Sequence, residues 1–278
     1  MAELSISDRG PVRVVVMGGA GSAGVASRRS QEAEPHGGGE ARMNVLSRAL
    51  VAELAAEAKR AGDDPSVRAV VLTGAGGRAF CAGANLKERR GWTEDDIRNW
   101  LVELHTALRE LEKCPKPWIA AVNGLALGGG CELALACDLR VVDPGAQMGL
   151  TETRIGIIPG GGGTVRLSRL VGLGRARDLI LTARRVPADE ALRIGLADRV
   201  SGPGGSLEAA IALANEIAAN APLGVATAKA ALAEAWDLAL DAALERERSH
   251  YETVLRSADR LEGLQAFAEK RAARWSGR

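Results

Sequence analysis

The sequence predicts an α/β fold in which a parallel-sheet core is followed by an all-helical region. Up to about residue 204, short apolar runs typical of buried strands alternate with segments of helical periodicity. From about residue 205 onwards, only helical periodicity remains. We therefore expect a core over residues 1–204 and a separately packed helical region over residues 205–278, of the kind that forms oligomer contacts.

The first predicted strand and helix flank an unusual segment. The run Val12–Met17 is mostly β-branched, as strands prefer. Residues 18–40 are rich in Gly, Ser, Ala and charge and cannot bury much apolar surface, so we expect a flexible insert there. Apolar residues spaced four apart then predict a helix over residues 46–58, with Asn44 or Ser47 as its N-cap.

Alternating strands and helices continue through the middle of the chain. The apolar run Val67–Thr73 predicts a strand buried on both faces, and Phe80–Lys87 reads as the loop after it. A helix over residues 94–112 ends at Pro115, and glycine runs at 128–130 and 160–163 each introduce a further helix. The remaining predicted strands are Trp118–Val122, Leu139–Val142 and Met148–Leu150. The remaining predicted helices are Cys131–Cys137, one from Thr164, Leu207–Asn220, Leu223–Trp236, Leu238–Ser257 and Arg260–Arg274.

Composition excludes several classes of function. The formal net charge of +1 argues against a protein built mainly to hold nucleic acid or an acidic membrane. No uncharged apolar run approaches the roughly 20 residues that span a bilayer, and Met1–Pro11 lacks the apolar region of a secretory signal. Four cysteines without Cys-x-x-Cys spacing and three scattered histidines give no zinc pattern. We expect a cytoplasmic protein without a bound metal.

One motif resembles a dinucleotide site. Residues Gly19–Gly24 match G-x-G-x-x-G directly after a predicted strand. Such a site also needs a full helix and a second strand ending in an acid, whereas Pro35 and three glycines follow here. We interpret the match as part of the insert.

A second glycine-rich segment is a stronger candidate for chemistry. Gly128, Gly129 and Gly130 precede Cys131 and Glu132 at a strand-to-helix junction. Free N–H groups at a helix start suit a developing negative charge, and Glu132 lies one helical turn after Gly129. The alternative interpretation is a close-packed glycine turn followed by a solvated glutamate.

Two further segments can complete that site. Glu152 follows a short strand, and paired carboxylates at strand ends can divide acid and base roles. A glutamate in a loop is otherwise a surface charge. The small-residue loop Phe80–Lys87 could add a second main-chain donor, or it could be an ordinary connection between a strand and a helix.

Together these segments resemble the enoyl-CoA hydratase/isomerase (crotonase) family. The resemblance runs from about residue 41 to the end and rests on several long motifs in order. They are Ala79–Ala84, Lys116–Gly124, Leu127–Leu139, Gly156–Thr164, Asp259–Gly263, Phe267 and Lys270–Arg271. The segments 80–89, 148–163 and 260–271 look closest to the methylglutaconyl-CoA hydratase branch.

The resemblance implies a fold, an assembly and a set of site residues. The fold would be a spiral of ββα repeats with a C-terminal helical trimerisation region, in a trimer or a dimer of trimers. The catalytic residues would be the carboxylates of Glu132 and Glu152 and the amides of Ala84 and Gly129. The substrate-binding residues would be Arg42, Ala82, Ala84, Asn85, Leu86, Lys87, Gly128, Gly129, Phe267 and Lys270.

The implied activity is that of a lyase that hydrates a 2-enoyl-CoA thioester in the degradation of fatty acids or branched-chain amino acids, and the branch that it resembles suggests 3-methylglutaconyl-CoA. Coenzyme A would be part of the substrate, and no cofactor is expected. Lys87, Arg89, Arg90 and Arg154 are candidates to meet a carboxylated acyl chain. A double-bond isomerase is the alternative, and isomerases of this family often need only one acid/base group. RNA binding, known for a relative in that branch, is disfavoured because Lys59, Arg60 and Arg68 are scattered among acids without stacking aromatics.

The sequence departs from the family pattern in two places. Asn85 stands where relatives usually carry Asp, a change that leaves the main-chain donor at Ala84 intact. Residues 18–40 replace the usual short turn ahead of Arg42, so contacts with CoA from this region are expected to differ.

Overall fold

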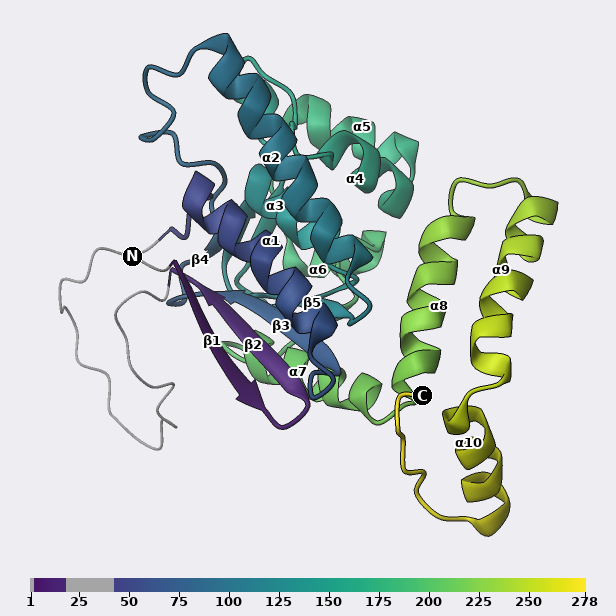
Figure 1. The fold of residues 1–278 in the computed structure, drawn as a ribbon. Helices are drawn as coiled ribbons and strands as arrows, with labels where there is room; N and C mark the ends of the chain where they lie inside the picture. Colours follow the sequence, from purple (N-terminus) through teal and green to yellow (C-terminus); the bar gives the residue numbers. More distant parts are fainter. Residues whose placement is uncertain (1–2, 19–42) are drawn as a thin grey trace, which may run out of the picture.

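The structure is a computed structural model that describes residues 3–18 and 43–278 (Figure 1). The glycine motif Gly19–Gly24, Arg42 and all of the expected insert except Gly18 lie outside the described residues. The rest of the chain folds around two sheets.

The larger sheet lies between two apolar clusters, one on each face. The described residues form six of its strands in the order β1-β2-β3-β5-β7-β10, all parallel except the β1–β2 pair. These are β1 (Leu4–Arg9), β2 (Val12–Met17), β3 (Ala69–Gly74), β5 (Trp118–Val122), β7 (Leu139–Val142) and β10 (Arg199–Val200). In β3, Val70 and Leu72 join the main core while Ala69 and Val71 join a second cluster on the opposite face. The predicted burial of this strand on both faces is confirmed.

A smaller sheet runs beside the first. It has the order β4-β6-β8-β9 among the described residues. Its strands are β4 (Ala79–Cys81), β6 (Leu125–Leu127), β8 (Gln147–Gly149) and β9 (Val186–Pro187). Three successive repeats, which begin at β3, β5 and β7, each place one strand in the large sheet, the next strand in the small sheet, and then a helix. This is the spiral of ββα repeats that was expected.

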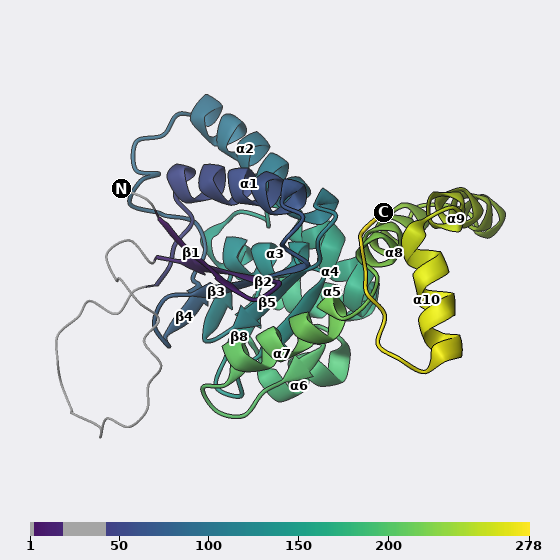
Figure 2. The same ribbon diagram turned by 60° about the horizontal axis from the view of Figure 1, so that its bottom comes forward.

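Helices enclose the sheets and extend beyond them. They are α1 (Arg48–Asp63), α2 (Glu94–Lys113), α3 (Gly129–Ala136), the 3-10 helix η1 (Glu152–Ile155), α4 (Gly163–Val171), α5 (Leu173–Thr182), α6 (Ala188–Ile194), α7 (Ser206–Ala218), α8 (Pro222–Ala235), α9 (Leu240–Leu255) and α10 (Ala258–Glu269). Figure 2 shows α1 and α2 on one side of the large sheet and α7 on the other.

Helix α7 belongs to the packing of the core. Ala210, Ile211, Leu213 and Ala214 are buried against the face formed by β2, β3, β5 and β7. A boundary at residue 204 would therefore separate the sheet from the helix that covers its second face. We propose that the division lies at residues 219–221, between α7 and α8.

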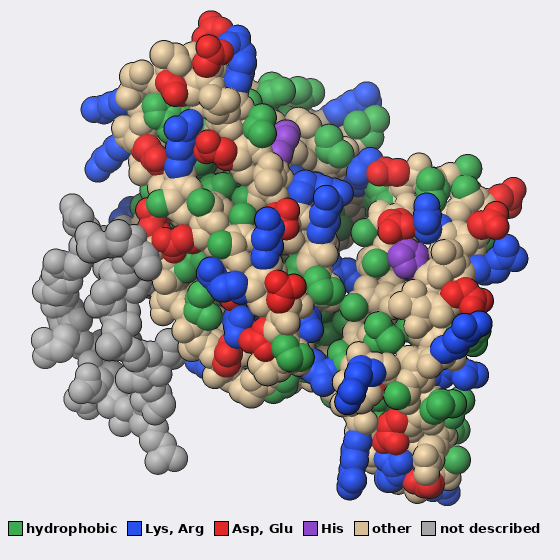
Figure 3. Space-filling view, viewed as in Figure 1, with side chains coloured by type: hydrophobic (Ala, Val, Ile, Leu, Met, Phe, Trp, Pro, Cys, Tyr) green, Lys and Arg blue, Asp and Glu red, His purple; other side chains and the backbone are tan. Residues whose placement is uncertain are grey.

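Helices α8, α9 and α10 project from the core as a separate layer (Figures 1 and 3). Lys229 of α8 fixes this layer, because its Nζ lies 2.7 Å from Oδ2 of Asp138 and also donates to the carbonyl of Lys116. At the C-terminus, Asp259 accepts hydrogen bonds from the amides of Ser276 and Gly277. Trp275 donates from Nε1 to the carbonyl of Ala219 at 2.7 Å, so the last residues return to the start of the layer.

In the part of the chain that the structure describes, no single helix has both the length and the apolar character needed to cross a bilayer. The pair α7 and α8 reaches them only when joined across a bend of 106°.

Several local predictions need correction. Of the two predicted caps of α1, Ser47 is confirmed, since its Oγ accepts from the amide of Leu50. Phe80 and Cys81 belong to β4 instead of a loop, because they are buried beside β6. The last helix ends at Glu269 and not at Arg274, because Lys270 adopts a left-handed conformation with φ 54°.

Candidate active site

Glu132 lies at the centre of the candidate site. It sits in the first turn of α3 and is only 2% exposed. Its Oε1 accepts hydrogen bonds from the amides of Gly161 at 2.7 Å and Gly163 at 2.8 Å. Burial raises the pKa of Glu132, while these two bonds oppose the rise because they stabilise the ionised carboxylate.

Glu152 approaches the same place from η1, directly after β8. Burial and then the charge of Glu132 raise the pKa of Glu152 to about 7. Its Oε2 is buried without a hydrogen-bond partner among the described residues. A Cβ added to Gly128 would lie 3.2 Å from its Oε1, so this carboxyl group borders the start of α3.

Two main-chain amides border the two carboxyl groups. Leu46 donates to the carbonyl of Gly83 and accepts from the amide of Asn85, and these bonds hold the chain on either side of Ala84. Among the residues that the structure describes, neither the Ala84 amide nor the Gly129 amide has an acceptor. A Cβ added to Gly129 would lie 3.8 Å from the Ala84 nitrogen and 4.0 Å from Oε2 of Glu132.

The junction of Gly128 and Gly129 therefore brings together two carboxyl groups and two unpaired N–H donors. Main-chain donors of this kind stabilise an oxygen that gains negative charge in a reaction. The carboxyl groups lie in different environments, since one is held by two amides and the other has no partner for Oε2. Such a difference separates a proton acceptor from a proton donor.

The other residues predicted to bind substrate form two groups, and the first group lies beside Ala84. Ala82, Leu86 and Lys87 lie within three residues of Ala84 in the chain, and the last two are exposed. Asn85 accepts at Oδ1 from the amides of Lys87 and Glu88, so the residue that departs from the family pattern still orders the loop.

Phe267 and Lys270 are not brought to Glu132 within one chain. They lie at the end of α10, in the projecting layer, and Figures 1 and 2 both show this helix well away from α3 and β4. Phe267 is 87% exposed. Arg42 lies outside the described residues.

The sequence interpretation missed the residues that hold Glu132. Gly161 and Gly163 bond to it directly, Arg166 bonds to the carbonyl of Gly161, and Glu112 bonds to Arg166. The only signal was the run of four glycines before Thr164, which we read as the start of a helix and not as a set of donors.

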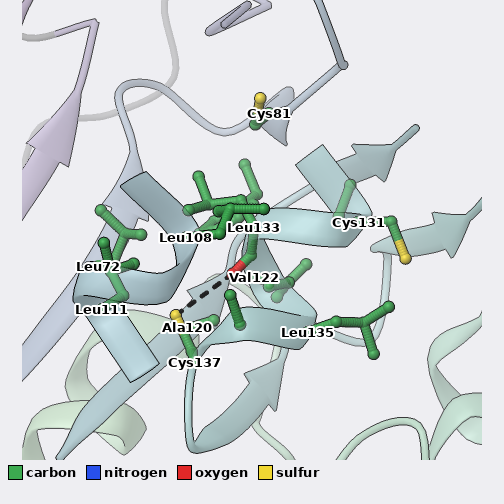
Figure 4. Close-up of a cluster of buried hydrophobic side chains, with 14 of the residues drawn as sticks. Leu72, Cys81, Leu108, Leu111, Ala120, Val122, Cys131, Leu133, Leu135 and Cys137 are labelled. Atoms are coloured by element: carbon green, nitrogen blue, oxygen red, sulfur yellow. Dashed lines mark hydrogen bonds between the residues drawn. The ribbon is translucent and has the colours of Figure 1, made fainter. Parts of the chain in front are cut away.

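The cysteines are buried in the core, and two of the basic residues considered for RNA binding form ion pairs. All four cysteines are free and buried. Figure 4 shows Cys81, Cys131 and Cys137 among apolar side chains, with the Sγ of Cys137 donating to the carbonyl of Leu133 at 3.5 Å. Lys59 and Arg60 of α1 form ion pairs with Glu110 and Glu57. Within residues 3–18 and 43–278, no group of three or more His, Cys, Asp or Glu side chains could hold a metal ion.

Comparisons with known proteins identify relatives of this chain. Residues 40–278 match the family model described as enoyl-CoA hydratase/isomerase. A short-chain-enoyl-CoA hydratase of Clostridium acetobutylicum is 44% identical over 209 residues, which cover 75% of this chain and 80% of the relative. The mitochondrial methylglutaconyl-CoA hydratase of Mus musculus is 39% identical, over 84% of this chain and 76% of the relative.

A solved structure is similar over almost the whole length. The enoyl-CoA hydratase of Bacillus anthracis is 41% identical and superposes with a TM-score of 0.89, covering 99% of this chain and 100% of that chain.

Proposed function

This chain belongs to the enoyl-CoA hydratase/isomerase family, and we propose that it is a hydratase that adds water across the 2,3 double bond of a 2-enoyl-CoA thioester. The observation that carries the proposal is the pair of glutamates in unlike environments beside two unpaired amides. An isomerase could work with one of these carboxyl groups, so the presence of both supports hydration.

In the proposed mechanism, the amides of Ala84 and Gly129 hold the thioester oxygen. Glu132, ionised, takes a proton from a water molecule whose oxygen attacks C3. The electron pair of the double bond moves towards the thioester, and negative charge builds on its oxygen. Each main-chain donor to such an oxygen typically contributes about 10²–10³ in rate.

Glu152, protonated, then delivers its proton to C2. Its pKa of about 7 supports this role, since a carboxyl group with an ordinary pKa would hold little proton at neutral pH. The reaction leaves Glu132 protonated and Glu152 ionised, so one proton must pass from the first group to the second, directly or through solvent, before the next turnover.

The decisive test replaces each glutamate by its amide. Glu132→Gln and Glu152→Gln should each lower kcat for crotonyl-CoA by about 10²–10⁴, because an amide can neither take nor supply the proton. Binding of the CoA ester should persist in both variants. Glu103→Gln, on the exposed face of α2, serves as the control. Near-normal hydration by either site variant would refute the proposal, and double-bond migration without hydration would favour an isomerase.

We further propose that the substrate carries a carboxylate on its acyl chain, as in 3-methylglutaconyl-CoA. Of the four basic candidates, Lys87, Arg90 and Arg154 are exposed, whereas Arg89 is half-buried and stacks 5.5 Å from the centroid of the Trp92 ring. Its burial lowers the pKa of Arg89. A half-buried guanidinium beside the substrate loop supports recognition of a carboxylate.

This substrate class is tested by comparing crotonyl-, 3-methylcrotonyl- and 3-methylglutaconyl-CoA. The carboxylated ester should have the highest kcat/KM, and Arg89→Met should lower that advantage about tenfold, whereas Arg90→Met should not. Equal kcat/KM values in the wild-type protein would contradict the branch assignment without touching hydration itself.

We also propose that the chain forms a trimer or a dimer of trimers through α8, α9 and α10. None of these three helices buries a large apolar side chain, and the exposed ones include Leu232, Leu240, Leu264 and Phe267. In such an assembly, Phe267 and Lys270 of one copy could approach the CoA site of another. Light scattering after gel filtration measures the state, and a monomer at micromolar concentration would contradict it. The expected cytoplasmic location and the absence of a cofactor beyond the substrate's own CoA stay predictions.

A further inference from the structure

The arrangement around Glu132 extends to a second layer of residues, which the proposed chemistry does not use. Gly161 has a double role, since its amide donates to Glu132 and its carbonyl accepts from the guanidinium of Arg166 at 2.5 Å. Arg166 lies in the first turn of α4, the helix whose first amide, at Gly163, supplies the other bond to Glu132. The guanidinium of Arg166 therefore holds the peptide segment whose amides bind the carboxylate of Glu132.

Arg166 is itself held in place. Its Nε donates to Oε1 of Glu112 at 2.5 Å, and the other oxygen of Glu112 accepts from Arg109 at 2.9 Å. Burial opposes ionisation of Glu112, but the hydrogen bond and charge of Arg166 outweigh it and lower the pKa of Glu112. The side chain of Arg166 is 16% exposed, so this ion pair bridges α2 and α4 with little access to water.

The backbone leaves space for the guanidinium. Gly162, between the two donors to Glu132, has φ +93°, a conformation that L side chains rarely adopt. A Cβ at this position would also overlap the Nη1 atom of Arg166. The glycine run thus permits the contact between Arg166 and the carbonyl of Gly161.

We propose that Arg166 is a positioning residue for Glu132, which holds the Gly161–Gly163 segment so that Oε1 of Glu132 is fixed and Oε2 is left for the reacting water. Glu112 orients Arg166 and balances its charge. This inference rests on the proposed base role of Glu132.

Charge gives the proposal a readout that loss of folding would not produce. The charged and titratable groups that face Glu132 are Arg166 from α4, His105 from α2 and Glu152 from η1, together with the neighbouring thiol of Cys131. The positive charge of Arg166 opposes the rise in the pKa of Glu132 that burial causes. Because Glu132 acts ionised, removing that charge should move the acidic limb of the kcat profile to higher pH.

The test compares three variants in a His105→Gln background, so that this imidazole contributes no charge near Glu132. Arg166→Met should lower kcat about tenfold with little change in KM, and should raise the acidic limb by about half a pH unit. Arg166→Lys keeps the positive charge but loses the forked donors of the guanidinium. Its acidic limb should therefore stay near the pH found for the His105→Gln parent, while its kcat should still be lowered. Glu112→Gln removes the balancing negative charge, so its limb should move to lower pH. Arg169→Met, on the same helix and exposed, is the matched control.

Opposite shifts for Arg166→Met and Glu112→Gln would support the proposal, because a general loss of packing would move both limbs alike. If Arg166→Met does not fold, Arg166→Lys and Glu112→Gln still decide the question. Wild-type kcat and an unmoved acidic limb in the folded variants would overturn it. Such a result beside an inactive Glu132→Gln would reject only this inference, whereas an active Glu132→Gln would reject the proposed function first.

Discussion

Two different effects raise the proton affinity of the Glu152 carboxyl group. Apolar surroundings and then the charge of Glu132 raise its pKa to about 7. Hydration needs this group protonated, so kcat should fall as pH rises through about 7. A hydration assay carried out at a series of pH values from 5.5 to 9 measures this fall in kcat. The control is KM, which should vary much less over the same range, and a flat kcat up to pH 9 would contradict the acid role.

The same pKa predicts how stability changes with pH. A folded-state pKa above the ordinary value of 4.5 means that the folded protein binds the proton more tightly than the unfolded chain. The stability from this group is fully present below pH 4.5 and is lost as pH rises through about 7.

Glu152→Gln removes the ionisable group, and with it the loss of stability that the wild type undergoes as pH rises through about 7. At pH 8 the variant should be more stable than the wild type by about 1–2 kcal/mol, after allowance for partial exposure of the side chain. At pH 4 the difference should vanish. Urea unfolding at the two pH values measures it, and an equal difference at both would contradict the pKa.

At this scale the sequence predicted the two acids as site residues but not the groups that contact them. Glu132 and Glu152 were predicted because each follows a strand end in a motif with glycines. The donors to Glu132 were missed because Gly161 and Gly163 are 29 and 31 residues away in the chain. Glu112 and Arg166 are 54 residues apart, and nothing in local periodicity pairs them.

Among the elements, α2 begins with a reciprocal cap. Thr93 accepts from the amide of Asp96, whose carboxylate accepts from the amide of Thr93. Thr93→Ala should destabilise the protein by about 1 kcal/mol, because the amide of Asp96 loses its acceptor and the carboxylate of Asp96 loses the Thr93 hydroxyl as a donor. Thr106→Ala is the matched control, since its Oγ1 bonds only to the carbonyl of Val102 within the same helix. Thermal unfolding compares them, and equal losses would contradict the capping role.

Elements with a strong period or an apolar run were predictable, and short ones were not. The strand Trp118–Val122 was predicted with its observed bounds, because every residue in it is apolar and buried. Strand β1 was missed because only Leu4 of its six residues is fully buried. β9 and β10 have two residues each, too few for a pattern, and they form only by pairing with β8 and β7.

At the scale of the whole molecule, Lys229 joins the projecting helices to the core. Lys229→Met would leave the carboxylate of Asp138, whose side chain is 30% exposed, with only the amide of Trp118 as a close donor, at a cost of about 1 kcal/mol. We also expect faster proteolysis at residues 219–221, where the two parts meet. Lys113→Met, an exposed lysine on α2, is the control. Unchanged cleavage at this junction would show that Lys229 does not hold the layer.

The division of the molecule is harder to read from the sequence than its fold class. A change from mixed to purely helical periodicity is visible at residue 205, but periodicity does not reveal what a helix packs against. The apolar face of α7 covers the sheet, while α8, with the same alanine-rich composition, lies outside it. Only the three-dimensional structure distinguishes them.

The position of α7 has a consequence for synthesis on the ribosome. Every strand that it covers precedes it in the chain, so the growing polypeptide must be almost four-fifths complete before that face of the sheet can be shielded. Until then, a nascent chain presents a broad aliphatic surface to the solvent, and such surfaces associate readily. We expect translation arrested before residue 206 to yield a product that binds chaperones, whereas arrest after α7 has emerged should release a folded core.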